Sequence, residues 1–279
     1  GHVRVVKQLL ENGANVNRTD TGQWSALMWA ALGGHPVVME VLLEAGARAG
    51  EKDAQGRTPL MQAAAEGKLE SVKVLLKRKI DVRERDLASR TALMLAASKG
   101  HTDMVNLLLD HGAEANVWTN DGRTALMFAA EGNHAETARA LIRRGSRVRA
   151  ADKDGWTPLI WAAAKGNPEV VRVLLEAGAR PNKRDRSGLP VLIRAAINGH
   201  PEVVNALIEG GAKVDIRDQD GFTPLMYAAY EGHLDTVKAL LNKGADPSAM
   251  AKEGAVTARV LADQKDFKEI SKLLLEAEK

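Results

Sequence analysis

Residues 218–233 read DQDGFTPLMYAAYEGH. Thr223 and Pro224 suit the start of a helix, because a threonine oxygen caps a free backbone N–H and proline has no N–H to leave unpaired. Gly232 suits a left-handed turn that ends a helix. The stretch therefore predicts a loop, then a short helix, then a turn.

The same features return every 33 residues along the chain. Each copy has a leucine, then Met or Ile, and, after one further residue, a pair of alanines; the leucines are Leu27, Leu60, Leu93, Leu126, Leu159, Leu192 and Leu225. An apolar stripe follows each copy, as at Val170, Val171, Leu174 and Leu175, and predicts a second helix. This period indicates stacked repeats, since one helix pair cannot bury its own apolar face.

The period predicts a single elongated domain with a partial repeat at 1–19, full repeats and a degenerate C-terminal cap at 251–279. The full repeats are 20–52, 53–85, 86–118, 119–151, 152–184, 185–217 and 218–250. In each we expect a first helix of about nine residues that stops at a glycine such as Gly166. Because residues 1–19 read as a second helix and its loop, we expect the natural protein to begin earlier.

The cap departs from the pattern in two ways. The segment Ala255-Val256-Thr257-Ala258 stands about one residue out of register, and the polar residues 263–266 replace the turn. A terminal repeat needs a polar outer face, so this loss of pattern is what a cap requires.

These motifs resemble the ankyrin repeat, whose consensus runs Asp-x-x-Gly-x-Thr-Pro-Leu-His-x-Ala-Ala-x-x-Gly-His and then a Val/Leu helix. The resemblance covers essentially the whole chain and implies an all-α solenoid of stacked antiparallel helix pairs with protruding β-turn loops. One departure is systematic: Met or Ile replaces the histidine after Thr-Pro-Leu in all seven units. That histidine commonly ties neighbouring loops in the family, so we expect an apolar contact in its place. Local departures are Pro190-Val191, Asn133 and Lys79-Ile80.

Composition excludes several classes of protein. The chain has no cysteine, which excludes a disulfide framework and any cysteine-ligated metal. No apolar run approaches the length of about 18 residues that a membrane span needs. No basic-then-apolar leader opens the sequence, so we expect no signal peptide and take the cytoplasm as the default location. With a net charge of +3, the composition is that of an ordinary folded chain.

The polar residues that could carry chemistry follow the repeat. Six of the seven histidines stand at one repeat position, directly after the first-helix stop, and are expected to be structural. Asp152, Asp185 and Asp218 recur in the same way, which predicts turn and cap hydrogen bonds. The motif Asn17-Arg18-Thr19 is a glycosylation acceptor pattern that is weak alone. We therefore predict no enzyme, no metal site and no cofactor.

The aromatic residues provide the candidate site. In the ankyrin family, partners bind the loop tips and the concave face of the first helices, and nine of the ten aromatics lie in those places. At the loop tips are Trp24, Trp156 and Phe222, and on a loop is Trp118. Directly before an Ala pair are Trp29, Phe128, Trp161 and Tyr227, and directly after one is Tyr230. Packing between repeats is the alternative for the four on the helix.

A basic block supplies the second signal. Residues 139–194 hold 13 basic and 5 acidic side chains. Its members at tips or on first helices surround Trp156 and Trp161; the candidate contacts among them are Lys165, Arg184, Arg186 and Arg194. Arg194 stands one repeat after Trp161, so a cation–π stack between them is predicted. A solvated basic face is the alternative.

Three functions fit these features. We favour a non-catalytic, monomeric module whose concave face and loop tips bind another protein, with an acidic segment as the preferred partner. Binding of a small ligand or of nucleic acid by stacking beside Arg and Lys is the second hypothesis. A purely architectural spacer in a longer chain is the third.

Overall fold

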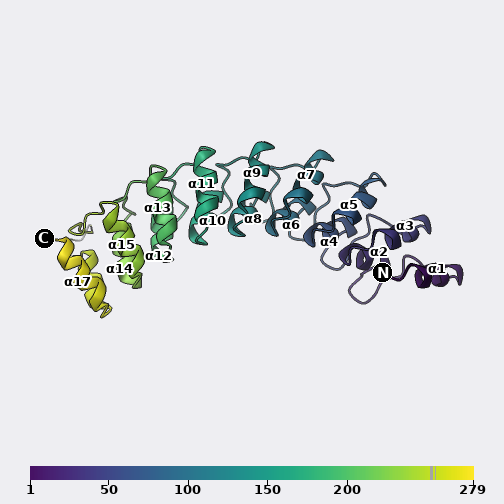
Figure 1. Ribbon diagram of the computed structural model, residues 1–279, viewed down its shortest axis with the longest axis horizontal. Coiled ribbons are helices and arrows are strands. Elements are labelled where there is room, and N and C mark those ends of the chain that lie inside the picture. Colours follow the sequence, from purple (N-terminus) through teal and green to yellow (C-terminus); the bar gives the residue numbers. More distant parts are fainter. Residues whose placement is uncertain (252–253, 255) are drawn as a thin grey trace. The chain divides into compact units, whose positions relative to one another are not determined.

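The structure is a computed structural model that describes residues 1–251, 254 and 256–279. These residues fall into two compact units, Gly1–Ser146 and Arg147–Lys279, which we name the N-terminal unit and the C-terminal unit. Both consist of helix pairs joined by loops (Figure 1). The described residues contain no β-strand, only the isolated bridges Thr19–Ser25 and Arg184–Pro190. The fold is therefore all-α, as predicted.

Each repeat contributes a first and a second helix. The first helices are α2 (Ala26–Leu32), α4 (Pro59–Ala65), α6 (Ala92–Ser98), α8 (Ala125–Glu131), α10 (Pro158–Ala164), α12 (Val191–Ile197), α14 (Pro224–Glu231) and α16 (Ala258–Gln264). The second helices are α1 (Val3–Glu11), α3 (Pro36–Glu44), α5 (Leu69–Leu76), α7 (Thr102–Asp110), α9 (Ala135–Arg143), α11 (Pro168–Glu176), α13 (Pro201–Glu209), α15 (Leu234–Asn242) and α17 (Lys268–Ala277).

The predicted capping explains where the first helices begin. In most of them the N-cap hydroxyl accepts a hydrogen bond from the backbone N–H three residues later; these N-caps are Ser25, Thr58, Thr91, Thr157, Thr223 and Thr257. Thr257 stands one residue later than the period requires, so the register shift of the cap is confirmed for its described residues. Ala255 lies outside the described residues.

The first helices are shorter than the predicted nine residues. In the repeat 20–52, α2 has seven residues, because Gly33 and Gly34 form the turn and the N–H of His35 closes on the carbonyl of Ala30 at 3.0 Å. Gly34 has φ 71°, which is the left-handed conformation that glycine adopts at no steric cost. Asn133 and Lys79 take the same conformation with φ 60° and 54°. These local departures from the family pattern thus keep its backbone geometry.

Stacking of first helices forms the core of each unit. In the N-terminal unit α2 packs on α4, α4 on α6 and α6 on α8; in the C-terminal unit α10, α12, α14 and α16 pack in the same succession. Every Ala pair of the seven full repeats is at most 5% exposed. The residues that replace the family histidine, such as Met127 and Ile160, are fully buried, so the expected apolar contact is present.

The histidines after the first helices tie one repeat to the previous one. The ring Nε2 of His101 lies 3.2 Å from the carbonyl oxygen of Ala65, and that of His134 lies 3.1 Å from the oxygen of Ser98. In the C-terminal unit His200 and His233 make the same bond to the preceding repeat. The structural role predicted for this position is confirmed for these four histidines.

Phe267 takes the place of this histidine in the cap. A Cβ atom added to Gly232 would lie 2.6 Å from the ring of Phe267, just as one added to Gly199 would lie 2.6 Å from the ring of His233. The aromatic ring therefore covers the turn of the last full repeat without the polar tie. Asp266, at φ 60°, supplies the left-handed turn in the cap.

Two threonines of the N-terminal unit offer a matched test of the caps. The Thr91 hydroxyl accepts from the N–H of Met94, whereas Thr124 makes no such bond and its buried Oγ1 has no partner among the described residues. We expect Thr91→Ala to lower the free energy of unfolding by about 1 kcal/mol, because a capped N–H is left unpaired. Urea unfolding should show a clearly smaller loss for Thr124→Ala, and equal losses would contradict the assignment.

Candidate functional site

The loop aspartates position the aromatic candidates. Oδ1 of Asp152 accepts from the backbone N–H groups of Asp154 and Trp156 at 3.0 and 2.8 Å, and Oδ2 accepts from the indole N–H of Trp161 at 2.8 Å. Asp152 itself is only 7% exposed. One carboxylate thus shapes the loop, which confirms the predicted turn role of this aspartate. It also orients two tryptophans, which is a second role that was not predicted.

The same link joins loop and first helix in other repeats. The side chain nine residues after the loop aspartate donates to its carboxylate from Trp29 to Asp20, from Gln62 to Asp53, from Arg194 to Asp185 and from Tyr227 to Asp218. This polar tie comes from the residue after the Met or Ile that replaces the family histidine, so it adds to the expected apolar contact. This spacing of nine between an aspartate and a donor is visible in five of the seven full repeats, and sequence reasoning missed it.

Two repeats of the N-terminal unit use another arrangement. Leu95 and Phe128 stand at the donor position and have no donor to offer. Asp86 accepts instead from Nε of Arg90 at 2.8 Å. The guanidinium of Arg123 lies 4.1 Å from the centre of the Phe128 ring and also pairs with Glu131.

Arg57, Arg90 and Arg123 occupy the repeat position of Trp24 and Trp156. Sequence reasoning missed these three arginines, because it did not compare every occupant of that position. The period itself was the signal that could have found them.

A continuous set of side chains forms in the C-terminal unit. The ring centres of Trp156 and Trp161 are 4.7 Å apart, and those of Phe222 and Tyr227 are 5.7 Å apart. Arg194 lies between the two pairs, with its guanidinium carbon 5.1 Å from the centre of the Trp156 ring. We name these five residues the aromatic row. A stack of Arg194 was predicted with Trp161, and the structure shows its guanidinium over the ring of Trp156, which packs against Trp161.

Charge in the aromatic row is largely compensated. Arg194 donates to Oδ2 of Asp185 from both Nε, at 2.9 Å, and the terminal nitrogen, at 2.5 Å. Burial works against ionisation of Asp185, but the hydrogen bonds from Ser187 and Arg194 outweigh it and hold the pKa of this carboxyl below its ordinary value. Burial and the hydrogen bond to Asp218 raise the pKa of Tyr227, so its phenol stays a donor.

The other basic candidates differ in what they contact. Lys165, at the C-cap of α10, and Arg186, on the next loop tip, are exposed. Arg184 is exposed too, but its guanidinium donates to the carbonyl oxygens of Gly188 at 2.8 Å and Arg217 at 2.5 Å. Arg217 bonds to the next loop in the same way. Arg184 therefore belongs to a series of loop-to-loop ties.

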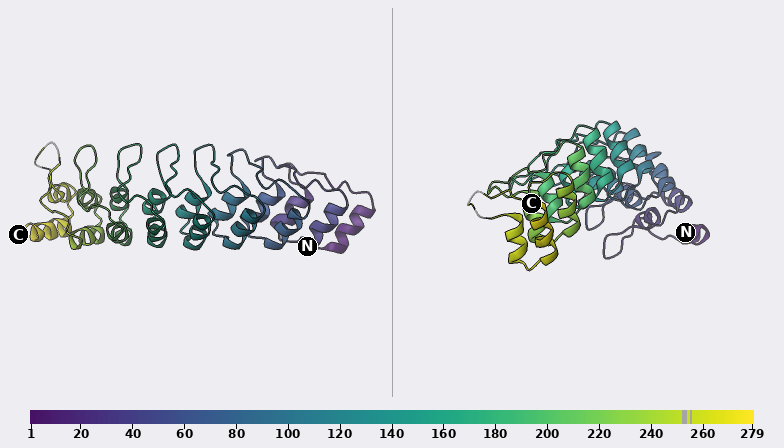
Figure 2. Two further views of the ribbon diagram at one scale, coloured as in Figure 1. Left: turned by 90° about the horizontal axis from the view of Figure 1, so that it is seen from above. Right: turned by 60° about the vertical axis from the view of Figure 1, so that its left-hand side comes forward.

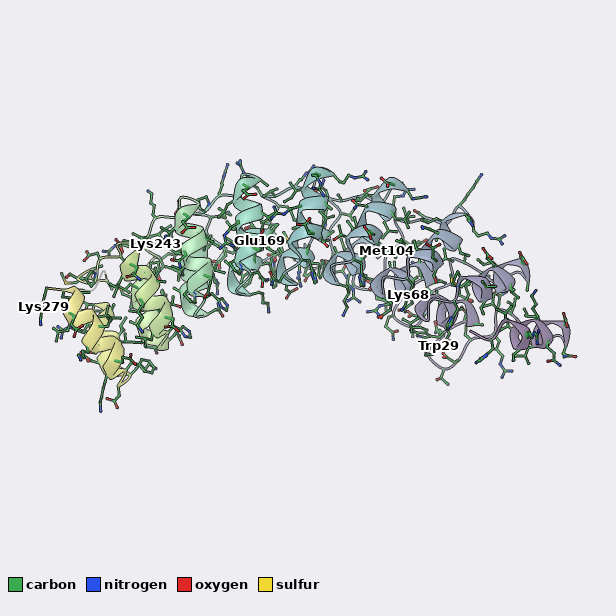
Figure 3. The ribbon with its side chains drawn as sticks, viewed as in Figure 1. Trp29, Lys68, Met104, Glu169, Lys243 and Lys279 are labelled. Carbon is green, nitrogen blue, oxygen red and sulfur yellow. The ribbon has the colours of Figure 1, made fainter. Side chains whose placement is uncertain are left out.

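The remaining aromatic candidates do not join the aromatic row. In the N-terminal unit the ring centres of Trp24 and Trp29 are 4.6 Å apart, and Trp29, labelled in Figure 3, is 54% exposed. Trp118 is 60% exposed on its loop, and Phe128 is half-buried. Tyr230, in the C-terminal unit, is partly exposed beside the ammonium of Lys265, 4.3 Å from its ring centre.

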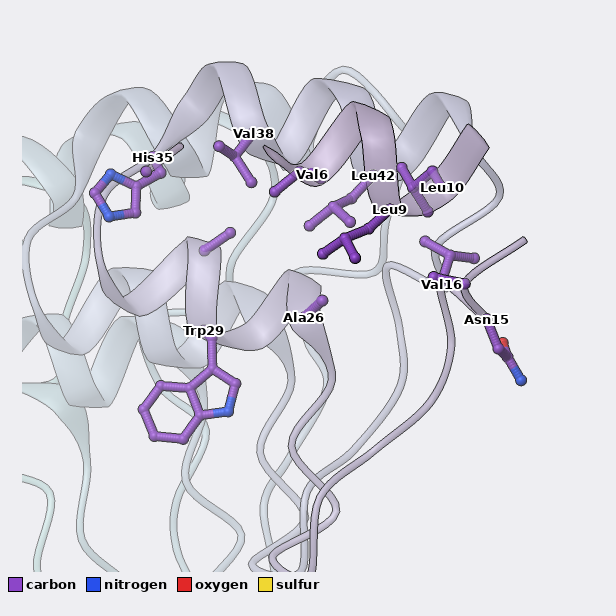
Figure 4. A pocket seen from close by; sticks show the side chains of 13 residues that line it. Val6, Leu9, Leu10, Asn15, Val16, Ala26, Trp29, His35, Val38 and Leu42 are labelled. Atoms are coloured by element: carbon purple, nitrogen blue, oxygen red, sulfur yellow. The ribbon is translucent and has the colours of Figure 1, made fainter. Parts of the chain in front are cut away.

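An apolar pocket of about 400 Å³ opens in the N-terminal unit between α1, α2 and α3. Val6 and Leu9 from α1 and Val38 and Leu42 from α3 face this space, with Ala26 on the opposite wall (Figure 4). In the later repeats of this unit the preceding first helix packs on the equivalent face, with α2 on α4, α4 on α6 and α6 on α8. The pocket is thus a feature of repeat stacking rather than a shaped ligand site.

The glycosylation pattern falls on a structural side chain. Nδ2 of Asn17 donates to the carbonyl of Gly46 at 3.1 Å, and its Oδ1 accepts from the N–H of Arg48 at 2.9 Å. Asn182 makes the equivalent bonds to the following repeat. Asn17 therefore holds two repeats together through both ends of its amide.

Loops protrude beyond the helix layers within each unit, as the left panel of Figure 2 shows. Within the described ranges no three His, Asp or Glu side chains gather in a way that could hold a metal ion. Nor does any described helix combine the length and apolar character needed to cross a bilayer. Helix pairs stacked through alanines, with loops that present varied side chains, define a repeat solenoid of the interaction-module class.

The comparison with protein families agrees with this class. The family described as "Ankyrin repeats (3 copies)" matches residues 1–86, 93–185 and 178–251, and the chain belongs to the ankyrin repeat family. Ankyrin repeats are generally protein–protein interaction modules and generally non-catalytic. A search of curated proteins finds no match.

The hydrogen bonds from the Asp152 carboxylate to its loop and to Trp161 form what we call the loop clamp. Asp152 and Asp154 allow a matched test of it. We expect Asp152→Ala to destabilise its repeat by about 1.5–3 kcal/mol, because hydrogen bonds to a buried charged group are lost. Asp154 is exposed and its side chain makes no bond in the described structure, so Asp154→Ala should stay within about 0.5 kcal/mol. Hydrogen exchange at the amides of residues 152–184 measures both, and equal protection in the two variants would refute the clamp.

Asp185 should contribute to the loss of stability in acid. Its folded pKa lies below the unfolded value, so its contribution is complete above the unfolded pKa and is lost as pH falls through the folded pKa. Asp185→Asn should therefore show a shallower fall in unfolding free energy below about pH 5 than the parent chain. Urea unfolding at several acidic pH values gives this slope, with Asp154→Asn as the exposed control. An unaltered slope in Asp185→Asn would contradict the shift.

Proposed function

We propose that the C-terminal unit binds a segment of another protein across the aromatic row. The observation that carries the proposal is the fixed, partly exposed set of four aromatic rings and one guanidinium from three consecutive repeats. Trp, Tyr and Arg are the side chains that most often anchor interfaces. Because Asp152, Asp185 and Asp218 already orient them, little side-chain entropy remains to be lost on binding.

Packing alone does not account for these rings. The first-helix position of Trp161 is occupied by Gln62, Leu95 or Arg194 in other repeats. The Ala pair that follows it stays buried in all of them. Since the core tolerates such different side chains at this position, their identity is free to serve contact with a partner.

Geometry within the C-terminal unit favours an extended segment. Stacked helices lie about 10 Å apart, so neighbouring repeats present their anchors at that interval. An extended chain advances about 3.3 Å per residue, and a partner would therefore offer one contact about every third residue. Three successive repeats contribute Trp161, Arg194 and Tyr227, which stand at the same position of the first helix.

Exposed cations next to the aromatic row favour an acidic partner. Arg194 is already paired with Asp185, so it offers a flat surface rather than free charge. Arg186 lies beside the tip of the preceding loop, where its Cγ would be 3.0 Å from a Cβ on Gly155. Lys153 is exposed on that same tip. These charges would raise the association rate with an acidic segment more than they would raise the affinity.

Nucleic acid is the weaker alternative. The rings of the two aromatic pairs are tilted by 59° and 46°, and the indole of Trp161 and phenol of Tyr227 already donate to aspartates. The carboxylates of these loops would also repel phosphates. Titration with short oligonucleotides at two salt concentrations tests this alternative, because phosphate-driven binding is strongest at low salt.

The chain contains its own control for the protein-binding site. Trp24 and Trp29 repeat the geometry of Trp156 and Trp161 in the other unit, including the indole-to-aspartate bond. For a partner captured by affinity and then purified, Trp156→Ala should weaken binding by at least about 2 kcal/mol. Trp24→Ala should change it by less than about 0.5 kcal/mol. Calorimetric affinities for both variants decide the question, and full binding by Trp156→Ala would overturn the site.

A further inference from the structure

A second, smaller pocket lies between consecutive repeats of the C-terminal unit. It has a volume of about 100 Å³ and none of its residues belongs to the aromatic row. The turn after α9 and the segment after α11 form its walls, and its lining is Val148, Arg149, Thr157, Ala179, Arg180 and Lys183. The lining contains three cationic side chains and no carboxylate.

These cations are placed without acidic partners. Arg149 is anchored through Nε, which donates to the carbonyl of Gly178 at 2.9 Å, and its terminal nitrogens remain to bind a ligand. The side chains of Arg180 and Lys183 are exposed, and no described carboxylate pairs with either. The hydroxyl oxygen of Thr157 accepts from the N–H of Ile160, so its own proton is still available to donate.

The N-terminal unit has an equivalent pocket whose lining is less positive, because it contains a carboxylate. Two repeats earlier, Val82, Arg83, Arg85, Thr91, Ala113, Glu114 and Val117 line a pocket of about 80 Å³. There Arg83 pairs with Asp81 at 3.1 Å and also faces Glu114.

The C-terminal unit has cations in place of Glu114 and Val117, which line that pocket, and of Asp81 beside it, whereas Ala151 replaces Arg85. Arg147, Arg180 and Lys183 stand where the N-terminal unit has Asp81, Glu114 and Val117. The backbone scaffold is common to both pockets, so the difference in charge is not a requirement of the fold.

We propose that the pocket of Arg149, Arg180 and Lys183 binds a phosphate group. Two guanidinium groups, an ammonium and a hydroxyl suit the several oxygens of a phosphate, which guanidinium forks bind in a bidentate manner. A divalent phosphate is preferred over a monovalent anion because three cationic residues line the pocket and no carboxylate does. This site is independent of the aromatic row, and its failure would leave the proposed protein-binding site untouched.

Titration of the whole chain by NMR tests the site, with chloride added to hold ionic strength constant. Inorganic phosphate and O-phosphoserine are the two probes, which separate a free ion from a phosphate carried on an organic group. Saturable shifts at Arg149, Arg180 and Thr157 are expected for at least one probe. Affinity should rise between about pH 5.5 and 7.5, as the phosphate loses its second proton near pH 6. No saturable shift with either probe would overturn the proposal.

The residues of the N-terminal pocket suggest a double variant that tests the phosphate site. R180E/K183V gives the C-terminal pocket the residues found at two of the equivalent positions, so the scaffold should accept them. Phosphate binding should weaken at least about tenfold, because charge-assisted hydrogen bonds are lost. R172E/K238V makes the same change of charge on the exposed surfaces of α11 and α15 and should leave the affinity unaltered. Equal weakening in both variants would show a diffuse charge effect and refute the pocket.

Discussion

Close contact between small side chains is the constraint on which this protein depends. Within each unit, the paired alanines of the first helices are buried where successive first helices pack. A larger side chain there would push the helices apart, because packed interiors have no spare volume. The other repeat-to-repeat ties operate only at this spacing; they are the histidine bond to the preceding turn, the asparagine amide bridge and the arginine link between loops.

The loop aspartates divide each repeat into a scaffold and a variable surface. Their backbone hydrogen bonds shape the loop, and their second oxygen holds whatever donor the first helix presents. Trp161, Arg194 and Tyr227 differ in shape and charge, yet each reaches an equivalent oxygen. A repeat can therefore change its contact surface by one substitution while the loop remains in place. The two pockets between repeats follow the same logic, since their scaffold is shared and their charge is not.

Much of the fold was predictable from local patterns. The caps at Thr58, Thr157 and Thr223, the left-handed turn at Gly166 and the buried Ala pairs all follow from the residues themselves. The length of the first helices was overestimated, because a period marks where the turn lies but not which residue makes the last helical bond. The candidate site was only partly predictable: the aromatic positions were visible, whereas the role of Arg184 in tying loops was not.

Periodicity alone was enough to determine the all-α repeat architecture, since a helix pair with one apolar stripe and small residues has no other way to bury its surface. The sequence did not determine which side chains of different repeats contact one another, because these contacts form only in the folded chain. Arg194 covers the ring of Trp156 while its guanidinium is tied to Asp185. The distinction between the two small pockets likewise arises only when the turn of one repeat is brought against the loop of the next. Spacing in the sequence predicts which residues share a face, but their partners are chosen by hydrogen bonds that form in three dimensions.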